Sequence, residues 1–217
     1  MSIRVIDLGL IEFLKAHKIQ KHLVDELKSN GWHDTLIICE HPPTITLGRK
    51  TRLENLLADE KTLKERKISV FRADRGGDVT YHGPGQIIAY PIFDLRRYKK
   101  DIHWFLRKLE EITIDFLWRY KISGERKKGF TGVWVGNKKI VSIGIGISNW
   151  ITFHGLAINV KTNLEYFSLI KPCGLKVEMT SMEAISGKNY NLTEVKPVLL
   201  RTIEQGFNHR FTNSLQK

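Results

Sequence analysis

Residues that could carry chemistry are concentrated in one glycine-rich stretch, Arg75-Gly76-Gly77-Asp78-Val79-Thr80-Tyr81-His82-Gly83-Pro84-Gly85-Gln86. Paired glycines let backbone amides approach a ligand closely. Arg75 offers forked donors to an anion, and His82 could hydrogen-bond or shuttle a proton. No Gly-Lys-Ser/Thr follows at P-loop spacing, and there is no G-x-G-x-x-G after a strand. The stretch therefore favours a ligand-binding loop over a plain surface turn, but not either of these nucleotide-binding motifs.

Cys173, in Lys171-Pro172-Cys173-Gly174, is a candidate nucleophile in a loop. A cysteine thiolate can accept an acyl group as a thioester. Because a free cysteine has a pKa of about 8.5, a nearby cation has to lower it, and Lys139 is the candidate cation. From these two residues alone, a chance loop cysteine beside a surface lysine stays the stronger alternative. Cys39 lies within an apolar run and is expected to be an inert core residue.

The sequence offers no metal-binding motif and no cofactor-binding motif. It contains no HExxH and no CxxC, and its histidines are scattered. A papain-like cysteine signature is absent, although His82 and His154 leave a Cys-His pairing formally open. His154 alternates with Leu156 and Ile158, a pattern more typical of a core histidine than of a catalyst. We therefore expect neither a metal nor a cofactor.

The pattern of apolar residues predicts the elements that must position these groups. Helical spacing predicts helices over residues 8–29 and 102–120, a weak one over 52–65, and one from Thr193, as N-cap, to about Phe211. Short apolar runs predict strands over residues 35–39, 68–71, 86–90, 133–135, 139–147 and 151–160. Because these elements do not alternate as βαβ units, we expect an α+β fold in which helices flank a mixed, mostly antiparallel sheet.

Two of the predicted strands each have a face with small side chains. Alternation places Ser142, Gly144 and Gly146 on one face of the first strand, and Gly155, Ala157 and Asn159 on one face of the next. Two such faces side by side would leave room for a ligand. The alternative is that the glycines only permit a bulge or close helix packing.

Its 217 residues indicate that the chain forms one domain, or one large and one small lobe. Hydrophobic residues make up 41% of the chain, and the formal net charge is +12. No apolar run is long enough to span a bilayer and no secretory signal is recognisable, so with only two cysteines we expect a cytoplasmic protein. The positive charge fits an acidic partner, an anionic membrane surface or nucleic acid. No nucleic-acid-binding signature accompanies it.

Together these segments resemble the lipoyl(octanoyl) transferase family. The signature is RGGDVTYHGPGQIIAY, residues 75–90. Further matching segments are Glu40-His41-Pro42-Pro43 with Thr46-Leu47-Gly48, then Lys139-Ile140-Val141-Ser142-Ile143-Gly144, then His154-Gly155-Leu156-Ala157-Ile158-Asn159-Val160, and then Pro172-Cys173-Gly174 with Thr180-Ser181. Val141 replaces an expected alanine, and the basic loop 124–129 matches no known motif.

The resemblance implies the fold of biotin and lipoate protein ligases and a set of roles. Cys173 would carry the acyl thioester, and Lys139 would lower the pKa of that thiol and serve in proton transfer. The acyl site would be lined by Arg75, Gly76, Gly77, Asp78, Val79, Thr80, Tyr81 and His82, by Ser142, Ile143 and Gly144, and by Gly155, Leu156 and Ala157.

The resemblance also implies the partners. Octanoyl-acyl carrier protein would be the donor, and apo lipoyl domains of 2-oxoacid dehydrogenase complexes and the glycine cleavage H protein would be the acceptors. We expect a monomer without a nucleic-acid or membrane partner. An ATP-dependent lipoate or biotin ligase of the same fold is the closest alternative, and a basic nucleic-acid-binding protein is an alternative of another class.

Overall fold

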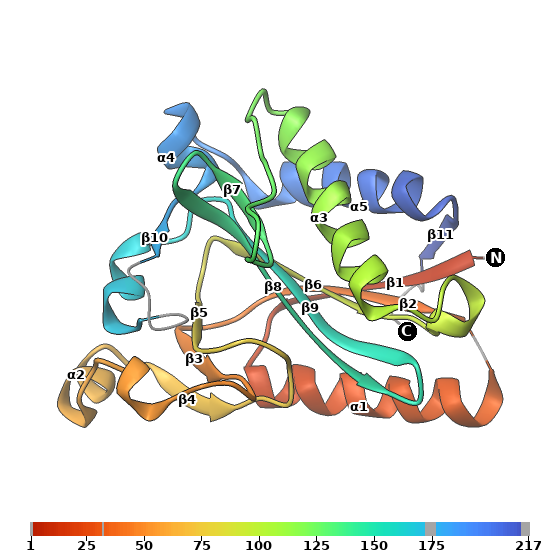
Figure 1. Cartoon of the computed structure of the whole chain (residues 1–217), viewed down its shortest axis with the longest axis horizontal. Helices are drawn as coiled ribbons and strands as arrows, with labels where there is room; N and C mark the ends of the chain where they lie inside the picture. The colour runs from red at the N-terminus through yellow and green to blue at the C-terminus, as the bar shows by residue number, and fades with distance from the viewer. Residues whose placement is uncertain (1, 32, 172–176, 214–217) are drawn as a thin grey trace.

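A mixed β-sheet runs through the middle of the computed structural model, which describes residues 2–31, 33–171 and 177–213 (Figure 1). Within these residues the strand order is β10-β8-β9-β6-β2-β1-β11, and β7 also pairs with β8. The strands are β1 (Ser2–Leu10), β2 (Thr35–Glu40), β6 (Gln86–Ile92), β7 (Val133–Val135), β8 (Lys138–Ser148), β9 (Ile151–Asn159), β10 (Glu178–Met179) and β11 (Arg210–Asn213). The central pairs β2-β6-β9-β8 are antiparallel, whereas β1, β10 and β11 join in parallel.

A small second sheet lies beside the large one. It consists of β4 (Ser69–Arg72), β3 (Thr44–Leu47) and β5 (Thr80–His82), in that order. Its apolar side chains form a cluster of their own, which includes Ile45 and Tyr81. The glycine-rich stretch therefore connects the two sheets, since β5 belongs to the small sheet and β6 to the large one.

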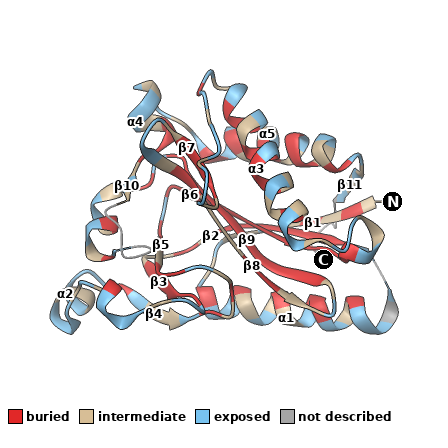
Figure 2. Ribbon diagram, in the orientation of Figure 1, coloured by how far each residue is buried: buried red, intermediate tan, exposed pale blue. Residues whose placement is uncertain are grey.

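Helices flank the large sheet, as Figure 1 shows. On one face α3 (Ile102–Trp118) and α5 (Leu192–Phe207) pack on a core that includes Phe105 and Leu199. On the other face, α1 (Phe13–Asn30) packs on residues such as Ile37 and Phe153. Figure 2 shows this layering, with buried strands between helices whose outer faces are exposed. The expected fold, a mixed and mostly antiparallel sheet flanked by helices, is confirmed.

The remaining elements are short. They are the α-helices α2 (Glu60–Glu65) and α4 (Met182–Ser186) and the 3₁₀ helices η1 (Leu53–Asn55), η2 (Leu95–Arg97) and η3 (Leu164–Leu169). None of the helices in the described ranges has the length and apolar character that crossing a bilayer requires.

The N-terminal boundary differs from the sequence-based expectation. The predicted helix begins at Phe13 rather than at residue 8, because Leu8 and Leu10 belong to β1. Further along, α5 is capped by Asn191, whose side chain accepts from the Thr193 amide, so the cap lies two residues before the predicted one. At its other end α5 stops at Phe207 rather than at about Phe211, because Arg210–Asn213 forms the strand β11, which pairs with β1. The long helices on the two faces of the sheet are otherwise as predicted.

Candidate active site

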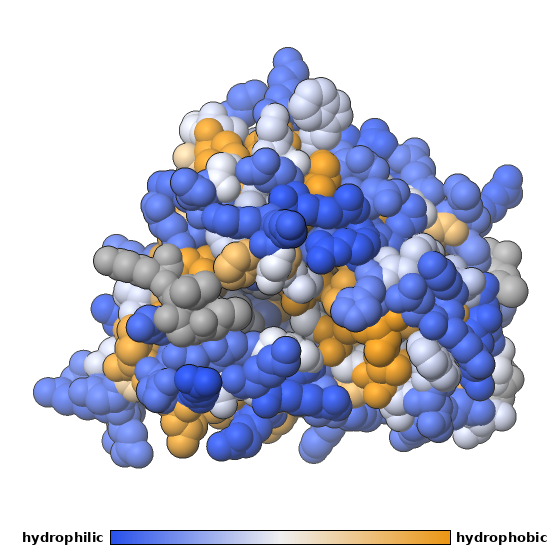
Figure 3. Space-filling model, in the orientation of Figure 1, coloured by the Kyte–Doolittle hydropathy of each residue, from blue (hydrophilic) through white to orange (hydrophobic). Residues whose placement is uncertain are grey.

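A cavity of about 620 Å³ lies between the large sheet and the small one, within the size range of small-molecule sites. Figure 3 shows a hollow near the centre of this face, with hydrophilic side chains below it and hydrophobic ones above it. Most of the predicted site residues line the cavity: Arg75, Gly77, Asp78, Val79, Thr80, His82, Lys139, Ser142, Ile143, Gly144, Gly155, Leu156 and Ala157. Gly76 and Tyr81 do not.

The two small strand faces meet as predicted. Ser142 pairs with Ala157 across β8 and β9, and Gly144 pairs with Gly155. The glycines, however, mainly permit close packing. A methyl group at Gly144 would lie 2.9 Å from the carbonyl oxygen of Gly76, and one at Gly155 would lie 2.1 Å from the carbonyl oxygen of Ala89. Backbone from neighbouring segments thus occupies much of the room that the sequence suggested for a ligand.

The start of the glycine-rich loop is anchored on β8 and β3. The Gly76 amide donates to the Ile145 carbonyl at 2.8 Å. The buried Arg75 guanidinium donates through Nη2 to both Thr46 oxygens at 2.8 Å, and through Nη1 to the Gly76 carbonyl at 3.1 Å. Arg75 therefore shapes the wall of the cavity through these contacts.

His82 has both ring nitrogens engaged. The Gln86 side-chain amide donates to the carbonyl of Tyr81 and to Asn159 Oδ1, so its own oxygen accepts from His82 Nδ1 at 2.8 Å. His82 Nε2 is then the acceptor facing the Thr46 hydroxyl, at 3.3 Å. Burial lowers the pKa of His82 to about 3. The residue is thus a neutral structural link, and these contacts give no support to the proton shuttle that its position in the sequence suggested.

The neighbours of His82 in the loop also have structural contacts. Asp78 accepts from Asn55 Nδ2 at 2.7 Å and from the Val79 amide at 2.7 Å. Tyr81 lies in the small-sheet cluster, where its ring stacks on Tyr166 with centroids 4.9 Å apart. Its side chain therefore supports the wall from behind.

Lys139 is half-buried and lines the cavity. It pairs with Trp134 on β7 and with Met179 on β10, and its Nζ lies 5.6 Å from the centre of the Trp134 ring. Cys173 lies outside the described residues. On either side of it, Val177 lines the cavity, and the Lys171 amide donates at 2.8 Å to the carbonyl of Asn55, another lining residue.

Sequence reasoning missed the aromatic residues of the wall. Phe13 and Tyr90 line the cavity, and so do Phe130 and Trp134 near Lys139. The Tyr90 hydroxyl lies 2.8 Å from His41 Nε2, and His41 Nδ1 donates to the Ile11 carbonyl. These residues come from four separate segments, so no local spacing indicates that they meet. Cys39 is buried in β2 as predicted, and burial raises the pKa of its thiol.

The structure places the His154 side chain on the opposite face of β9 from the one that the alternation predicted. Its φ of 56° interrupts the alternation of β9, and its ring lies among Phe13, Tyr90 and Phe153 rather than with Leu156. The amide of His154, turned away from the regular ladder, donates to Gln20 Oε1 on α1 at 2.7 Å. A positive φ at a non-glycine residue has no signature in the sequence.

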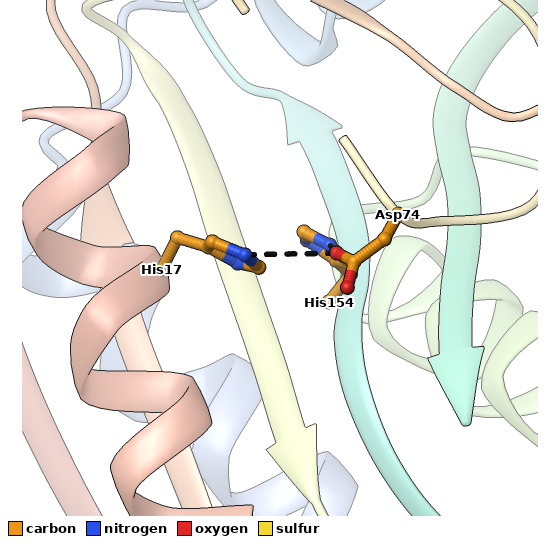
Figure 4. Close-up of side chains that lie close together, drawn as sticks. All are labelled: His17, Asp74 and His154. Atoms are coloured by element: carbon orange, nitrogen blue, oxygen red, sulfur yellow. Dashed lines mark hydrogen bonds and ion pairs between the residues drawn. The ribbon is translucent and has the colours of Figure 1, made fainter. Parts of the chain in front are cut away.

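His154 belongs to a cluster with His17 and Asp74 (Figure 4). Its Nε2 donates to Asp74 Oδ1 at 2.8 Å, and His17 Nε2 lies 3.6 Å from the same oxygen. These are atom types that a transition metal accepts. Lys21 already pairs with the other Asp74 oxygen, however, and the two imidazole planes are within 9° of parallel. The cluster is better explained as a hydrogen-bonded link that joins α1, the loop and β9.

Protonation fits this description of the cluster. The His154 hydrogen bond and the Lys21 ammonium hold the pKa of Asp74 well below its usual range, against the effect of its partial burial. Burial lowers the pKa of His154 and of His17. Near neutral pH an ionised Asp74 is therefore balanced by Lys21 beside two neutral imidazoles.

Comparison with known proteins gives the family. Residues 12–204 match the model of the lipoyl protein ligase A/B catalytic domain. An octanoyltransferase of Solibacter usitatus is 48% identical over 87% of this chain and 85% of its own length. Among solved structures, a lipoate protein ligase of T. acidophilum superimposes with a TM-score of 0.78 at 17% identity, covering 100% of this chain and 90% of the other.

A biotin protein ligase of Aquifex aeolicus gives a TM-score of 0.55 at 16% identity, covering 96% of this chain and 70% of that one. At such identities the two solved structures establish the shared fold alone. The sequence relative, at far higher identity, distinguishes transferase from ligase. The chain belongs to the lipoyl protein ligase A/B family, in its octanoyltransferase branch.

Proposed function

We propose that this octanoyltransferase takes the octanoyl group from acyl carrier protein and passes it to a lysine of a lipoyl domain through a thioester on Cys173. One observation carries the proposal: the described residues that flank Cys173 lie at the cavity that Lys139 lines. Val177 lines this cavity, and the Lys171 amide donates a hydrogen bond to the carbonyl of the lining residue Asn55. The described residues on both sides of Cys173 thus border the cavity that contains the proposed cation.

In the first half-reaction the Cys173 thiolate attacks the thioester carbonyl of the donor. A bond forms between Cys173 Sγ and the acyl carbon, the bond to the carrier's pantetheine sulfur breaks, and the released thiolate takes up a proton. In this proposal Lys139 stabilises the attacking thiolate by its charge. Both the bond broken and the bond formed are thioesters, so the step needs no input from ATP.

In the second half-reaction the amine of the acceptor lysine attacks the acyl-enzyme. A carbon–nitrogen bond forms, the carbon–sulfur bond breaks, the nitrogen loses a proton, and Cys173 is regenerated as a thiolate. The acceptors we propose are apo lipoyl domains of 2-oxoacid dehydrogenase complexes and the glycine cleavage H protein. A reducing compartment, the cytoplasm, would keep the thiol available, and we expect residues 1–217 to work as one catalytic domain in a monomer.

The charge of the cavity edge supports an acidic donor. Lys50 and Arg52 are exposed and line the cavity together with one exposed acidic residue, Glu54, which pairs with Arg52 at 3.7 Å. Lys127 and Lys128 immediately precede the lining residue Gly129 in the chain. Acyl carrier proteins are acidic, so these cations would favour encounter with the donor.

The decisive experiment is intact mass spectrometry after mixing the protein with octanoyl-acyl carrier protein. An octanoyl adduct that hydroxylamine removes is expected in the wild type and in Cys39→Ala, whose residue is buried away from the cavity, but not in Cys173→Ser. If no adduct forms and transfer requires ATP with free octanoate, the proposal is wrong and the chain acts as a ligase.

A further inference from the structure

Glu110, on α3, is a fully buried carboxylate, with 0% exposure. Its Oε2 accepts from Arg107 Nη1 at 2.6 Å and lies 3.2 Å from Arg126 Nε. Its Oε1 accepts from the backbone amide of Gly132 at 3.0 Å. One side chain therefore holds both ends of the segment from Arg126 to Gly132.

That segment forms part of the cavity wall. Gly129, Phe130 and Thr131 line the cavity directly. Arg126 secures the first end further, because its Nη2 donates to the Arg107 carbonyl at 2.9 Å. The basic loop singled out in the sequence is thus tied to α3 by its arginine.

Gly132 is the point at which this segment contacts Lys139. A methyl group at Gly132 would lie 2.6 Å from Lys139 Cε, 3.2 Å from Lys139 Nζ and 2.4 Å from the carbonyl oxygen of Val141. The end of the lysine side chain therefore rests against the backbone of Gly132. A shift of that backbone would move the Lys139 amine.

We propose that Glu110 is a positioning residue for Lys139: by fixing the Gly132 amide and Arg126 it sets where the lysine amine lies relative to the reacting thiol. The inference rests on the proposed function, since it assigns Lys139 a role in the reaction. Glu110 does not line the cavity, and it acts only through the segment it holds.

The arrangement needs a carboxylate because both oxygens act as acceptors. In Glu110→Gln one of the two positions becomes an NH₂ group, which can only donate. The remaining oxygen is expected to take the position of Oε2, where the guanidinium groups of Arg107 and Arg126 donate to it. The Gly132 amide then loses its acceptor in a buried site, and its backbone is expected to shift.

The test measures the pH dependence of Cys173 alkylation by iodoacetamide, followed by intact mass. Cys39 is fully buried, so the adduct in folded protein reports on Cys173. Glu110→Gln should move the alkylation profile toward higher pH by about half a unit to one unit and slow acyl-enzyme formation by about tenfold. Gly132→Ala, which presses on Lys139 directly, should move the profile in the same direction.

Two controls separate positioning from loss of stability. Asp34→Asn changes another buried carboxylate, one that accepts from the Asp94 amide at 3.0 Å and pairs with Arg97 at 3.5 Å, away from the lining residues. It should lower Tm and leave the profile unmoved. Asp115→Asn, on the exposed side of α3, should leave both unchanged.

The proposal is overturned if Glu110→Gln keeps the wild-type profile, whether or not its Tm falls. If Glu110→Gln does not fold, an unmoved profile in Gly132→Ala overturns it. Alkylation needs no acyl donor, so absence of an acyl-enzyme in the wild type would refute the proposed function without deciding the role of Glu110.

Discussion

Mild acid should destabilise the fold through two buried histidines. Burial lowers the pKa of His82 to about 3 and that of His41 to about 4, from an ordinary value of 6.5. Both imidazoles are therefore neutral in the folded chain, whereas in the unfolded chain they take up protons as the pH falls below 6.5. Because the unfolded state binds more protons, the free energy of unfolding must fall as the pH falls through this window.

The size of the effect follows from the shifts. Between pH 7 and pH 5 each histidine lowers the free energy of unfolding by about 2 kcal/mol, and the two together by about 4 kcal/mol. Burial also lowers the pKa values of His17 and His154, which act in the same direction. Folded proteins typically have a total stability of about 5–15 kcal/mol, so the loss is a large fraction of it.

Urea unfolding followed by tryptophan fluorescence, at steps between pH 7 and pH 5, measures this directly. The double variant His41→Gln/His82→Gln should be less stable at pH 7, but its stability should depend much less on pH. His22→Gln, which removes an imidazole with 74% of its side chain exposed, should keep the wild-type slope. A wild-type loss below about 2 kcal/mol, or an equal slope in the double variant, would refute the reasoning.

Three further predictions concern the cavity. Arg75→Lys should lower the free energy of unfolding by about 1–3 kcal/mol and slow acyl-enzyme formation, because an ammonium cannot reproduce the forked contacts to Thr46; unchanged values in urea unfolding and intact mass would contradict this. Gly155→Ala should cost more than about 2 kcal/mol because its methyl group meets β6. Gly129→Ala, whose added methyl group has no described heavy atom within 4 Å but whose φ is 83°, should lower the free energy of unfolding by only about 1 kcal/mol. Equal losses in the two variants would contradict the contact between Gly155 and β6. Raised salt should increase KM for the acyl carrier protein with little change in kcat, and a constant KM would exclude charge-assisted docking.

The sequence predicted well the elements whose pattern is local. Alternation over β8 and β9 placed Ser142 opposite a small face, and the register bears this out with its pairing to Ala157. Helices α3 and α5 were recognisable because their apolar stripes each pack on one side of the sheet. A continuous apolar run likewise predicted that Cys39 lies in a buried strand, which the structure confirms.

Other features depend on contacts between distant segments. Strand β1 was missed because its pairing with β2 and β11 is set by tertiary context, while the spacing of Leu10, Phe13 and Leu14 fits a helix as well as a strand end. Strands β3 and β5, of four and three residues, are too short to show a period. The positive φ of His154 is stabilised by Gln20 and Asp74, neither of which is near it in the chain.

The hydrogen bond between Gln20 and the His154 amide spans 134 positions of the chain. Until α1 docks, this amide lacks its acceptor and the middle of β9 is incomplete. The cavity wall likewise draws on residues from Phe13 to Met179, so no short contiguous fragment contains it. During synthesis, the cavity can therefore form only after most of the chain has been made, and its assembly has to close long loops, which slows folding. For the same reason, an acyl group held in the cavity should stabilise the chain from its first helix to β10 as a single cooperative unit.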